Sequence, residues 1–422
     1  MTYSPRIIDS LLDDLVPELA AIALEGAKGV GKTATATQRA ATIFSLNKRA
    51  QRAVVAADPE AVTLAAKPTF IDEWQLVPDV WEEVRSAVDN NTSGGQFLLA
   101  GSAGIAPGVR IHSGAGRIIS LTMRPLAFSE RGIATPAVSL GELLSGVRPR
   151  VTGTTSVSLD TYTDEILRSG FPGIRGLGER GRKMQLDSYL SRLVARELPE
   201  NGVSIRHPGA LMKWLAAYGA ATSTDASYTT LLDAASAGVA DKPARSTIES
   251  YREHLERLYV LDPLPPWIPT FNPLKRLRRS PKHHLVDPGL AARLVGVGKS
   301  GLLHGEGTVS QSTGTWLGAL FESLATQSIR VYAEPHGAQL GHLRTSDNRR
   351  EIDLIVEGED RGVVAIEVKL AATIGDRDVR HLNWLQDQIG DRLADKVVVN
   401  TGPYAYRRPD GVAVVPLALL GP

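Results

Sequence analysis

The sequence predicts an α/β fold in several domains, the first of which is built on a parallel sheet. Residues 26–33 fit the pattern G-x-x-x-x-G-K-[ST], and an apolar, strand-like run over residues 20–24 stands directly before them. Residues 34–41 contain neither Pro nor Gly and fit a helix. This strand, loop and helix, followed by further apolar runs that alternate with helical periodicity, predict parallel strands joined by helices.

The glycine-rich loop has the residue types that bind a nucleoside triphosphate. Its glycines can adopt backbone conformations that other residues avoid, so that successive N–H groups point towards phosphate oxygens. The predicted binding residues are Gly26, Ala27, Lys28, Gly29, Val30, Gly31, Lys32 and Thr33. Lys32 would reach the β- and γ-phosphates and Thr33 would ligate Mg²⁺, so ATP and Mg²⁺ are the expected cofactors. A glycine-rich turn before a surface helix is the alternative.

A second apolar run, which begins at Thr69, ends in two adjacent carboxylates, Asp72 and Glu73. P-loop ATPases use such a pair, because one carboxylate holds Mg²⁺ through water and the next polarises the attacking water. We therefore expect Asp72 to help bind Mg²⁺ and Glu73 to be a catalytic residue. An acidic strand end that caps the next helix is the alternative. That helix is predicted over residues 77–88, where apolar residues recur at helical spacing.

Two more apolar runs, residues 96–100 and 118–121, extend the predicted sheet. Ser102 follows the first run, and the carboxyl ends of parallel strands face the nucleotide, so Ser102 is placed to sense the γ-phosphate. Arg117 stands just before the second run, where ring-forming ATPases place an arginine finger that reaches a neighbouring subunit's nucleotide. A serine in a tight turn and a solvated loop arginine are the respective alternatives.

Four segments, in this order, carry a resemblance to a known family: residues 26–33, 70–75, 97–102 and 123–130. Together they resemble the predicted AAA+-type ATPases of bacteria and archaea that carry a C-terminal domain of unknown function. The likeness runs along almost the entire chain. It implies that the glycine-rich loop is the Walker A motif, that Asp72 and Glu73 form the Walker B motif, and that Ser102 is a sensor. The ATPase domain is expected over residues 1–150.

The middle of the chain predicts mainly helices. Residues 147–158 are rich in Gly, Pro, Ser and Thr and read as a linker, and a helical lid is expected over residues 151–205. Three short helices and a strand-like run then resemble a winged helix-turn-helix over residues 206–270. Arg245 and Arg252 would lie on the exposed face of its groove-entering helix and contact nucleic acid. A winged helix that only packs against protein is the alternative.

A basic run follows, in a connector expected over residues 271–310. Its cations are Lys275, Arg276, Arg278, Arg279 and Lys282. They could neutralise several phosphates of DNA, which would make the affinity steeply dependent on salt. A solvated loop whose charges pair with acidic neighbours is the alternative.

The C-terminal segment, residues 311–422, predicts a restriction-endonuclease-like α/β domain. Asp353 lies in one strand-like run, and Glu367 and Lys369 are two residues apart in the next, so the latter two share a face. Two carboxylates and a lysine in this order, with Glu322 on a preceding helix, resemble the PD-(D/E)XK nuclease core. They form a candidate second metal site for phosphodiester cleavage. A fold that persists without cutting DNA is the alternative, so nuclease activity is left open.

Composition narrows the class of protein. The net charge is +1, so a nucleic-acid surface has to be local, and the absence of cysteine suits a reducing compartment. No apolar stretch approaches the roughly 20 residues of a membrane span, so we expect a cytoplasmic protein without a membrane partner.

The sequence thus predicts an ATP-hydrolysing, AAA+-type ATPase that acts as a DNA-binding motor or remodeller, for example on branched DNA. If Arg117 acts between subunits, the protein forms a homo-oligomeric ring such as a hexamer. The alternative is a nucleotide-dependent regulatory switch that binds protein partners and carries a nuclease-like domain that does not cut.

Overall fold

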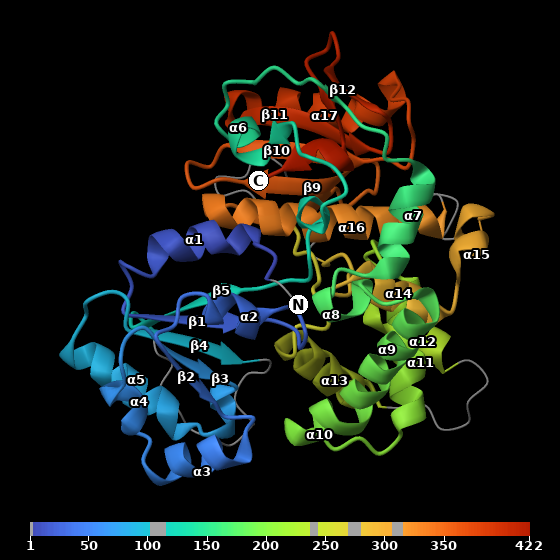
Figure 1. Cartoon of the computed structure of the whole chain (residues 1–422). Coiled ribbons are helices and arrows are strands. Elements are labelled where there is room, and N and C mark those ends of the chain that lie inside the picture. The colour runs from blue at the N-terminus through green and yellow to red at the C-terminus, as the bar shows by residue number, and fades with distance from the viewer. Residues whose placement is uncertain (1–2, 102–114, 237–243, 269–279, 306–314) are drawn as a thin grey trace. The chain divides into compact units, whose positions relative to one another are not determined.

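Five parallel strands form one sheet of the protein, as seen in a computed structural model that describes residues 3–101, 115–236, 244–268, 280–305 and 315–422 (Figure 1). Their order in the sheet is β2-β3-β4-β1-β5, and every neighbouring pair is parallel. The strands are β1 (Ala21–Glu25), β2 (Thr42–Ser45), β3 (Thr69–Asp72), β4 (Phe97–Gly101) and β5 (Ile118–Thr122). The predicted parallel sheet is confirmed.

The chain divides into two compact units. The first unit comprises Met1–Pro125, Ser191–Arg206 and Glu249–Val260, and it holds the parallel sheet. The second unit comprises Leu126–Leu190, His207–Ile248 and Leu261–Pro422. Neither unit is continuous in sequence, so the division does not follow the predicted run of domains.

Helices cover the parallel sheet of the first unit. They are α1 (Ile7–Leu15), α2 (Lys32–Thr37), α3 (Arg49–Ala57), α4 (Ala61–Leu64), the 3₁₀ turn η1 (Trp74–Leu76) and α5 (Asp79–Asn90). The amphipathic helix predicted over 77–88 is confirmed as α5, which packs Val80 and Val84 against Ile71 and Leu99 of the sheet. The helix predicted over 34–41 ends early, because the chain enters the edge strand β2, which was not predicted.

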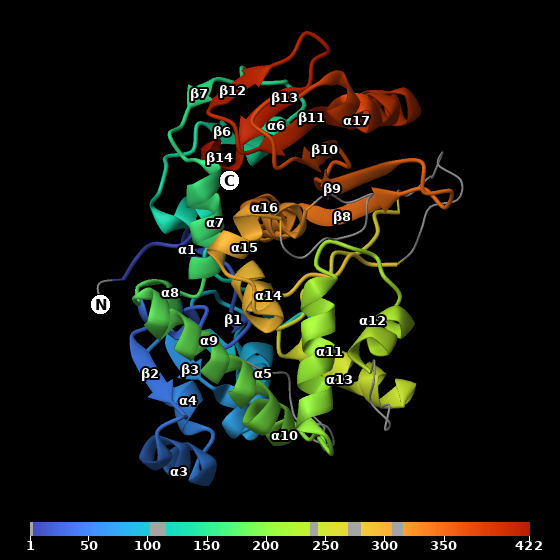
Figure 2. The same cartoon turned by 90° about the vertical axis from the view of Figure 1, so that its right-hand side faces the viewer.

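A mixed, seven-stranded sheet forms the centre of the second unit, in the order β7-β12-β13-β11-β10-β9-β8 (Figure 2). β8, β9 and β10 are antiparallel neighbours, whereas β10, β11 and β13 are parallel. The strands are β7 (Gly153–Thr154), β8 (Gln339–Arg344), β9 (Glu351–Glu357), β10 (Val363–Val368), β11 (Leu393–Asn400), β12 (Tyr404–Arg407) and β13 (Ala413–Pro416). The predicted C-terminal α/β domain is confirmed.

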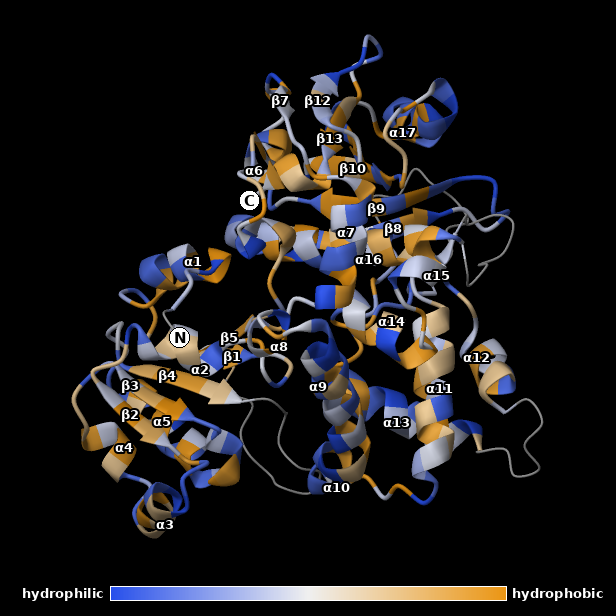
Figure 3. Cartoon of the chain, turned by 45° about the vertical axis from the view of Figure 1, so that its right-hand side comes forward, coloured by the Kyte–Doolittle hydropathy of each residue, from blue (hydrophilic) through white to orange (hydrophobic). Residues whose placement is uncertain are grey.

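Two long helices flank this sheet. The buried helix α16 (Trp316–Ala333) contacts β8, β9 and β10, and α17 (Asp376–Ile389) buries Val379, Leu382 and Leu385 over β10 and β11. Short 3₁₀ turns are η2 (Phe128–Arg131), η4 (Glu334–His336), η5 (Gly390–Arg392) and η6 (Leu417–Leu419). Figure 3 shows apolar residues gathered in the central strands of both units, such as β4 and β10, whereas α9 is largely hydrophilic.

The middle of the chain is helical, as predicted. It contains α7 (Leu159–Arg168), α8 (Pro172–Arg175), α9 (Glu179–Arg192), the π-helix η3 (Leu193–Glu197), α10 (Leu198–Glu200), α11 (Pro208–Ala220), α12 (Tyr228–Ala235) and α13 (Arg245–Arg257). After α13, Leu261 and Leu264 form antiparallel bridges to Leu285 and Lys282. The three helices α11, α12 and α13 and these short antiparallel bridges correspond to the parts of the predicted winged helix. Since α13 divides between the two units, they do not form one separate domain.

The two compact units differ from the predicted domain boundaries at two places, and the boundaries themselves stay a prediction. The first segment of the first unit ends at Pro125, because the chain that follows joins the second unit. There β6 (Val138–Ser139) pairs with β14 (Leu420–Gly421), α6 (Leu140–Leu144) packs on the mixed sheet, and β7 extends that sheet. β7 lies within the predicted linker 147–158. The predicted connector 271–310 contains α14 (Pro288–Val295) and α15 (Lys299–Leu303), and α14 is packed against α7 and α11.

A buried aspartate holds these helices of the second unit together. Asp287 is fully buried, and its Oδ1 accepts a hydrogen bond from the Gly289 N–H at 2.8 Å, which caps α14. Its Oδ2 accepts from the Gly170 N–H at 2.6 Å, so that α14 is tied to the turn after α7. Both carboxylate oxygens are therefore committed to main-chain donors that have no access to water.

We expect Asp287→Asn to destabilise the second unit by about 1–3 kcal/mol, because the amide has one acceptor oxygen and leaves one buried N–H unsatisfied. Urea unfolding followed by circular dichroism measures the loss. Asp376→Asn is the matched control, since the side chain of Asp376 is 98% exposed, and it should change stability by less than about 0.5 kcal/mol. Equal stability of the two variants would contradict the role of Asp287.

Candidate functional site

The glycine-rich loop joins β1 to α2 at the carboxyl end of the parallel sheet. Gly26, Gly29 and Gly31 have φ values of 145°, 87° and 111°, which residues other than glycine rarely adopt. A Cβ atom on Gly26 would also lie 2.1 Å from the carbonyl oxygen of Met123. The guanidinium of Arg6 donates to the carbonyls of Val30 and Arg124, each at 2.9 Å, and braces the loop from behind. The backbone is thus held in the form that a phosphate-binding loop needs.

Lys32 is a buried cation whose ammonium is turned into the loop. Its Nζ donates to the carbonyl oxygens of Gly26 at 2.6 Å and Ala27 at 3.0 Å. Burial lowers the pKa of this ammonium to about 8, although nearby Glu73 and Asp72 oppose the shift. A buried ammonium that is bonded to carbonyl dipoles gains from a negatively charged partner, so this position fits a phosphate.

Thr33 and Asp72 meet next to Lys32. The Thr33 hydroxyl donates to both carboxylate oxygens of Asp72, at 3.0 and 3.1 Å. Burial raises the pKa of Asp72, while the bond from Thr33 opposes the rise. A hydroxyl and a carboxylate, both hard oxygen ligands, are what Mg²⁺ requires beside the phosphates of ATP. The residues present therefore fit the ion.

Glu73 follows β3 in a strained backbone conformation, with φ 55° and ψ 45°. This left-handed region is costly for a side chain larger than glycine, and such strain persists where the surrounding structure holds a functional group in place. The Glu73 carboxylate accepts a hydrogen bond from the side-chain amide of Gln75. Glu73 thereby stands at the carboxyl end of β3, beside Asp72, as a catalytic base would.

Three contacts of this site within the first unit were not predicted. Glu25, the last residue of β1, accepts hydrogen bonds from the Ser120 hydroxyl at 2.9 Å and from the Tyr259 hydroxyl. Tyr259 follows α13 and has a φ of 56°. In the loop, Lys28 forms an ion pair with Glu197 of the π-helix at 2.7 Å. Such pairs bring together residues far apart in sequence, for which a single sequence carries no signal.

The remaining predicted residues of the ATPase site lie elsewhere. Ser102 lies outside the described residues. Arg117 is ion-paired with Asp89 and stands before β5, whose first residue, Ile118, is in register with Ala21 of β1. The glycine-rich loop follows the other end of β1, four residues along the strand or about 13 Å away. Arg117 therefore does not face the loop of its own chain, and its role towards a neighbouring subunit stays a prediction.

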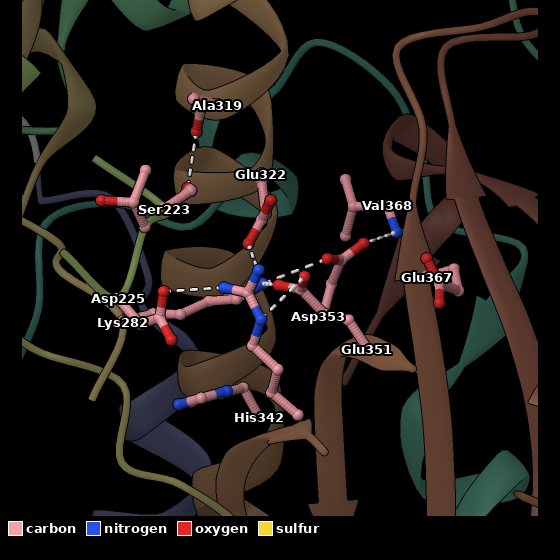
Figure 4. A network of polar contacts seen from close by, with 12 residues as sticks. Ser223, Asp225, Lys282, Ala319, Glu322, His342, Glu351, Asp353, Glu367 and Val368 are labelled. Carbon is pink, nitrogen blue, oxygen red and sulfur yellow. Dashed lines mark hydrogen bonds and ion pairs between the residues drawn. The ribbon is translucent and has the colours of Figure 1, made fainter. Parts of the chain in front are cut away.

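A second polar cluster lies in the second unit, where α16 and β9 converge on Lys282 (Figure 4). The Lys282 ammonium contacts the carboxylates of Glu322 at 2.9 Å, Glu351 at 3.0 Å and Asp353 at 3.1 Å. Lys282 is 1% exposed. Although burial acts to lower it, these carboxylates raise the pKa of the lysine well above its usual value.

The predicted nuclease-like residues are brought together at this cluster. The Oδ2 atom of Asp353 accepts a hydrogen bond from the Val368 N–H at 2.9 Å and lies 3.8 Å from the ammonium of Lys369. Lys369 also contacts Glu367 at 2.7 Å. Burial raises the pKa of Glu322 to about 8 and that of Glu367 well above its usual value, which favours protonated carboxyls. Glu351 was missed, although its place two residues before Asp353 puts it on the same strand face.

The predicted nucleic-acid residues have different outcomes. Lys282 was wrongly placed on an exposed basic loop, because its side chain is buried among the carboxylates of the cluster. Lys275, Arg276, Arg278 and Arg279 lie outside the described residues. Arg245 opens α13, and Arg252, in the same helix, lies 3.8 Å from Glu256. Their contact with nucleic acid stays a prediction.

Family comparisons identify the class of the first unit. Residues 19–132 match the family model described as an AAA domain, and this match spans the parallel sheet and both motifs of the site. Residues 159–301 and 317–420 match two domains of unknown function, DUF8612 and DUF4143. With its parallel sheet and glycine-rich loop, the chain carries a P-loop ATPase domain of the AAA class.

Particular relatives come from bacteria and archaea. An uncharacterized protein of Mycobacterium tuberculosis and one of Mycobacterium bovis are each 27% identical over 354 residues, which cover 82% of this chain and 67% of the relative. A Walker-type ATPase of Pyrococcus abyssi aligns in structure with a TM-score of 0.42 and 15% identity, over 69% of this chain and 96% of that one. Within the described residues, no helix is long and apolar enough to cross a membrane.

The lowered pKa of Lys32 makes ATP affinity dependent on pH. Phosphates favour the charged lysine, so affinity should be high below pH 8 and fall as the free site loses its proton above it. With a pKa of about 8, we expect ATP to bind about eight-fold more weakly at pH 9 than at pH 7.5. Titration with a fluorescent ATP analogue measures this change.

Lys32→Arg is the control for this titration, because arginine keeps its charge throughout the range. The affinity that this variant retains should be independent of pH. If the natural protein shows the same flat profile, the ammonium of Lys32 does not titrate in the free site.

Proposed function

We propose that this protein binds and hydrolyses ATP at the glycine-rich loop of its AAA domain and uses the energy to act on DNA, as an oligomeric motor or remodeller. The observation that carries the hydrolytic part is the convergence of Lys32, Thr33 and Asp72 at the end of β1 and β3, with Glu73 next to them. Mg²⁺ held near Thr33 and Asp72 would supply charge neutralisation for the phosphates. Glu73 would accept a proton from the attacking water.

Action on DNA is supported by the basic run that contains Lys275, Arg276, Arg278 and Arg279, and by the winged-helix order of α11, α12 and α13. The hydrogen bond from Tyr259 to Glu25 supports coupling, because it joins the residue after α13 to the last residue before the glycine-rich loop. A ligand that shifts α13 would thereby act on the nucleotide site.

Assembly into a ring is proposed on the basis of Arg117. Arg117 lies at the amino ends of the strands, away from the glycine-rich loop of its own chain. The nucleotide that it would contact is therefore that of a neighbouring subunit. The ion pair with Asp89 would open on assembly. A regulatory switch that binds protein partners is the second candidate. The ion pairs of Lys282 with Glu322 and Asp353 support it, because a lysine among these carboxylates would compete with the metal ion that cutting requires.

We expect Glu73→Gln to bind ATP with an affinity within about two-fold of the natural protein while its turnover falls by about 100-fold or more, since the amide cannot accept the proton. Steady-state phosphate release and equilibrium ATP titration measure the two quantities. Glu60→Gln, at an exposed glutamate of the same unit, is the matched control and should leave both unchanged. If Glu73→Gln hydrolyses ATP as fast as the natural protein, another residue must be the catalytic base.

We expect duplex or branched DNA to raise ATP turnover several-fold, with an effect that fades as salt increases. Replacing Lys275, Arg276, Arg278 and Arg279 by Ala should remove up to four phosphate contacts and reduce the slope of log affinity against log salt by up to about 3.6. Removal of Lys48, Arg49 and Arg52 around α3 is the control for loss of positive charge. An ATPase indifferent to DNA would favour the regulatory switch.

A further inference from the structure

Lys282 lies among three carboxylates of the C-terminal domain, two of which, Glu322 and Asp353, belong to the predicted nuclease-like site. The main chain of Lys282 is fixed by two hydrogen bonds with Leu264, from N–H to carbonyl in both directions, each at 2.9 Å. Its side chain enters between α16 and β9, where its ammonium touches three carboxylates within 3.1 Å (Figure 4). A cation that is supplied by the chain itself thus bridges the helix acid and the strand acids.

Four carboxylate oxygens of the cluster already accept hydrogen bonds from this chain, whereas the buried Oε1 of Glu367 has no hydrogen-bond partner in the part of the chain that the structure describes. In Asp353, Oδ1 accepts from Lys282 and Oδ2 accepts from the Val368 N–H. In Glu322, Oε1 accepts from Lys282, and in Glu367, Oε2 accepts from Lys369. Mg²⁺ demands near-octahedral oxygen ligation at about 2.1 Å, and the fixed ammonium of Lys282 would repel a second cation placed among the same carboxylates. Among the described residues, no group of three or more acidic or histidine side chains is arranged to hold a metal ion.

Electrostatics explains why a fixed cation is needed here. Glu322, Glu351 and Asp353 approach one another in a buried region, and uncompensated like charges at such distances disfavour ionisation. The positive charge of Lys282 keeps the pKa of the Asp353 carboxyl below its usual value, together with that of Lys369. On the far side, Arg344 contacts Asp225 at 2.7 Å and Glu351 at 3.6 Å. The cluster is therefore neutralised by side chains of this protein.

We propose that Lys282 replaces the divalent cation of a nuclease-like site, so that the C-terminal domain neither binds Mg²⁺ at this cluster nor cuts DNA by metal-dependent hydrolysis. Instead, the lysine anchors the chain that follows the basic run to the C-terminal sheet, since Arg279 is only three residues before it. This role is independent of ATP hydrolysis in the first unit.

Removing the lysine should open the cluster to a metal ion. Binding of Mn²⁺ alone, without nucleotide, is measured by electron paramagnetic resonance on the full chain carrying Asp72→Asn, which disables the ATPase metal site. We expect this parent to bind no Mn²⁺ at the cluster at 1 mM, roughly the weak end of protein cation sites, and Lys282→Ala to bind one ion with a Kd of roughly 0.1 mM. Adding Asp353→Asn should abolish that binding.

Lys396→Ala is the matched control, because Lys396 is also buried but donates to the Asn383 side chain and the Asp410 carbonyl rather than to a carboxylate cluster. It should gain no Mn²⁺ site. The proposal is overturned if the parent binds Mn²⁺ and loses it with Asp353→Asn, or if folded Lys282→Ala binds none. Should Lys282→Ala not fold, Lys282→Met keeps the length of the side chain and replaces it in the titration.

Nicking of supercoiled plasmid tests the same proposal without altering Lys282. The natural protein with Mg²⁺ should leave the plasmid intact. Nicking that requires Mg²⁺ and disappears in Glu367→Ala would overturn the proposal, even if neither Lys282 variant folds. This failure would leave the proposed ATPase untouched, because that activity is measured separately through Glu73→Gln.

Discussion

The charge of a buried ammonium group has to be balanced, and this constraint governs both polar sites of the protein. Lys32 in the first unit is bonded to two main-chain carbonyls, and burial lowers its pKa to about 8. Lys282 in the second unit is surrounded by carboxylates, which raise its pKa. The first lysine gains from an incoming anion, whereas the second already has its counter-charges. The same residue type therefore forms a binding site in one unit and a structural centre in the other.

The ATPase part of the fold was predictable because its signals are local. The apolar runs before Gly26 and Asp72 are continuous and end at the residues that carry the chemistry, as buried parallel strands do. β2 escaped prediction because it is a four-residue edge strand whose Ile43 is exposed. The boundary at Pro125 escaped because β6 and β7 have two residues each and exist through pairing with strands more than 200 residues later.

The candidate sites show the same limit. Gly26 to Thr33, Asp72 and Glu73 could be selected as candidates because motif and spacing coincide, and Asp353, Glu367 and Lys369 because they alternate along strands. Lys282 was misassigned because a run of basic residues does not indicate which side chain turns inward. The direction is decided by its pairing with Leu264, a contact between segments that neither segment predicts alone. The sequence nevertheless indicates that a cation is needed near β9. Glu351 and Asp353 are two residues apart and lie on one face of the strand, and two buried acids so close together are stabilised by a positive charge.

Within the first unit, the amino-terminal part of the glycine-rich loop has two links to segments that come from later in the chain. Glu25 precedes the loop and binds Tyr259 after α13, and Lys28 in the loop binds Glu197 of the π-helix. π-Helices are rare and commonly mark functional positions, and Tyr259 has a strained φ of 56°. A phosphate that draws Lys32 away from the carbonyls of Gly26 and Ala27 changes the loop between these two links. The same five-residue stretch, from Glu25 to Gly29, thus contains the two carbonyls that Lys32 contacts and both contacts to the distant helices, which is the route that the proposed coupling to α13 would use.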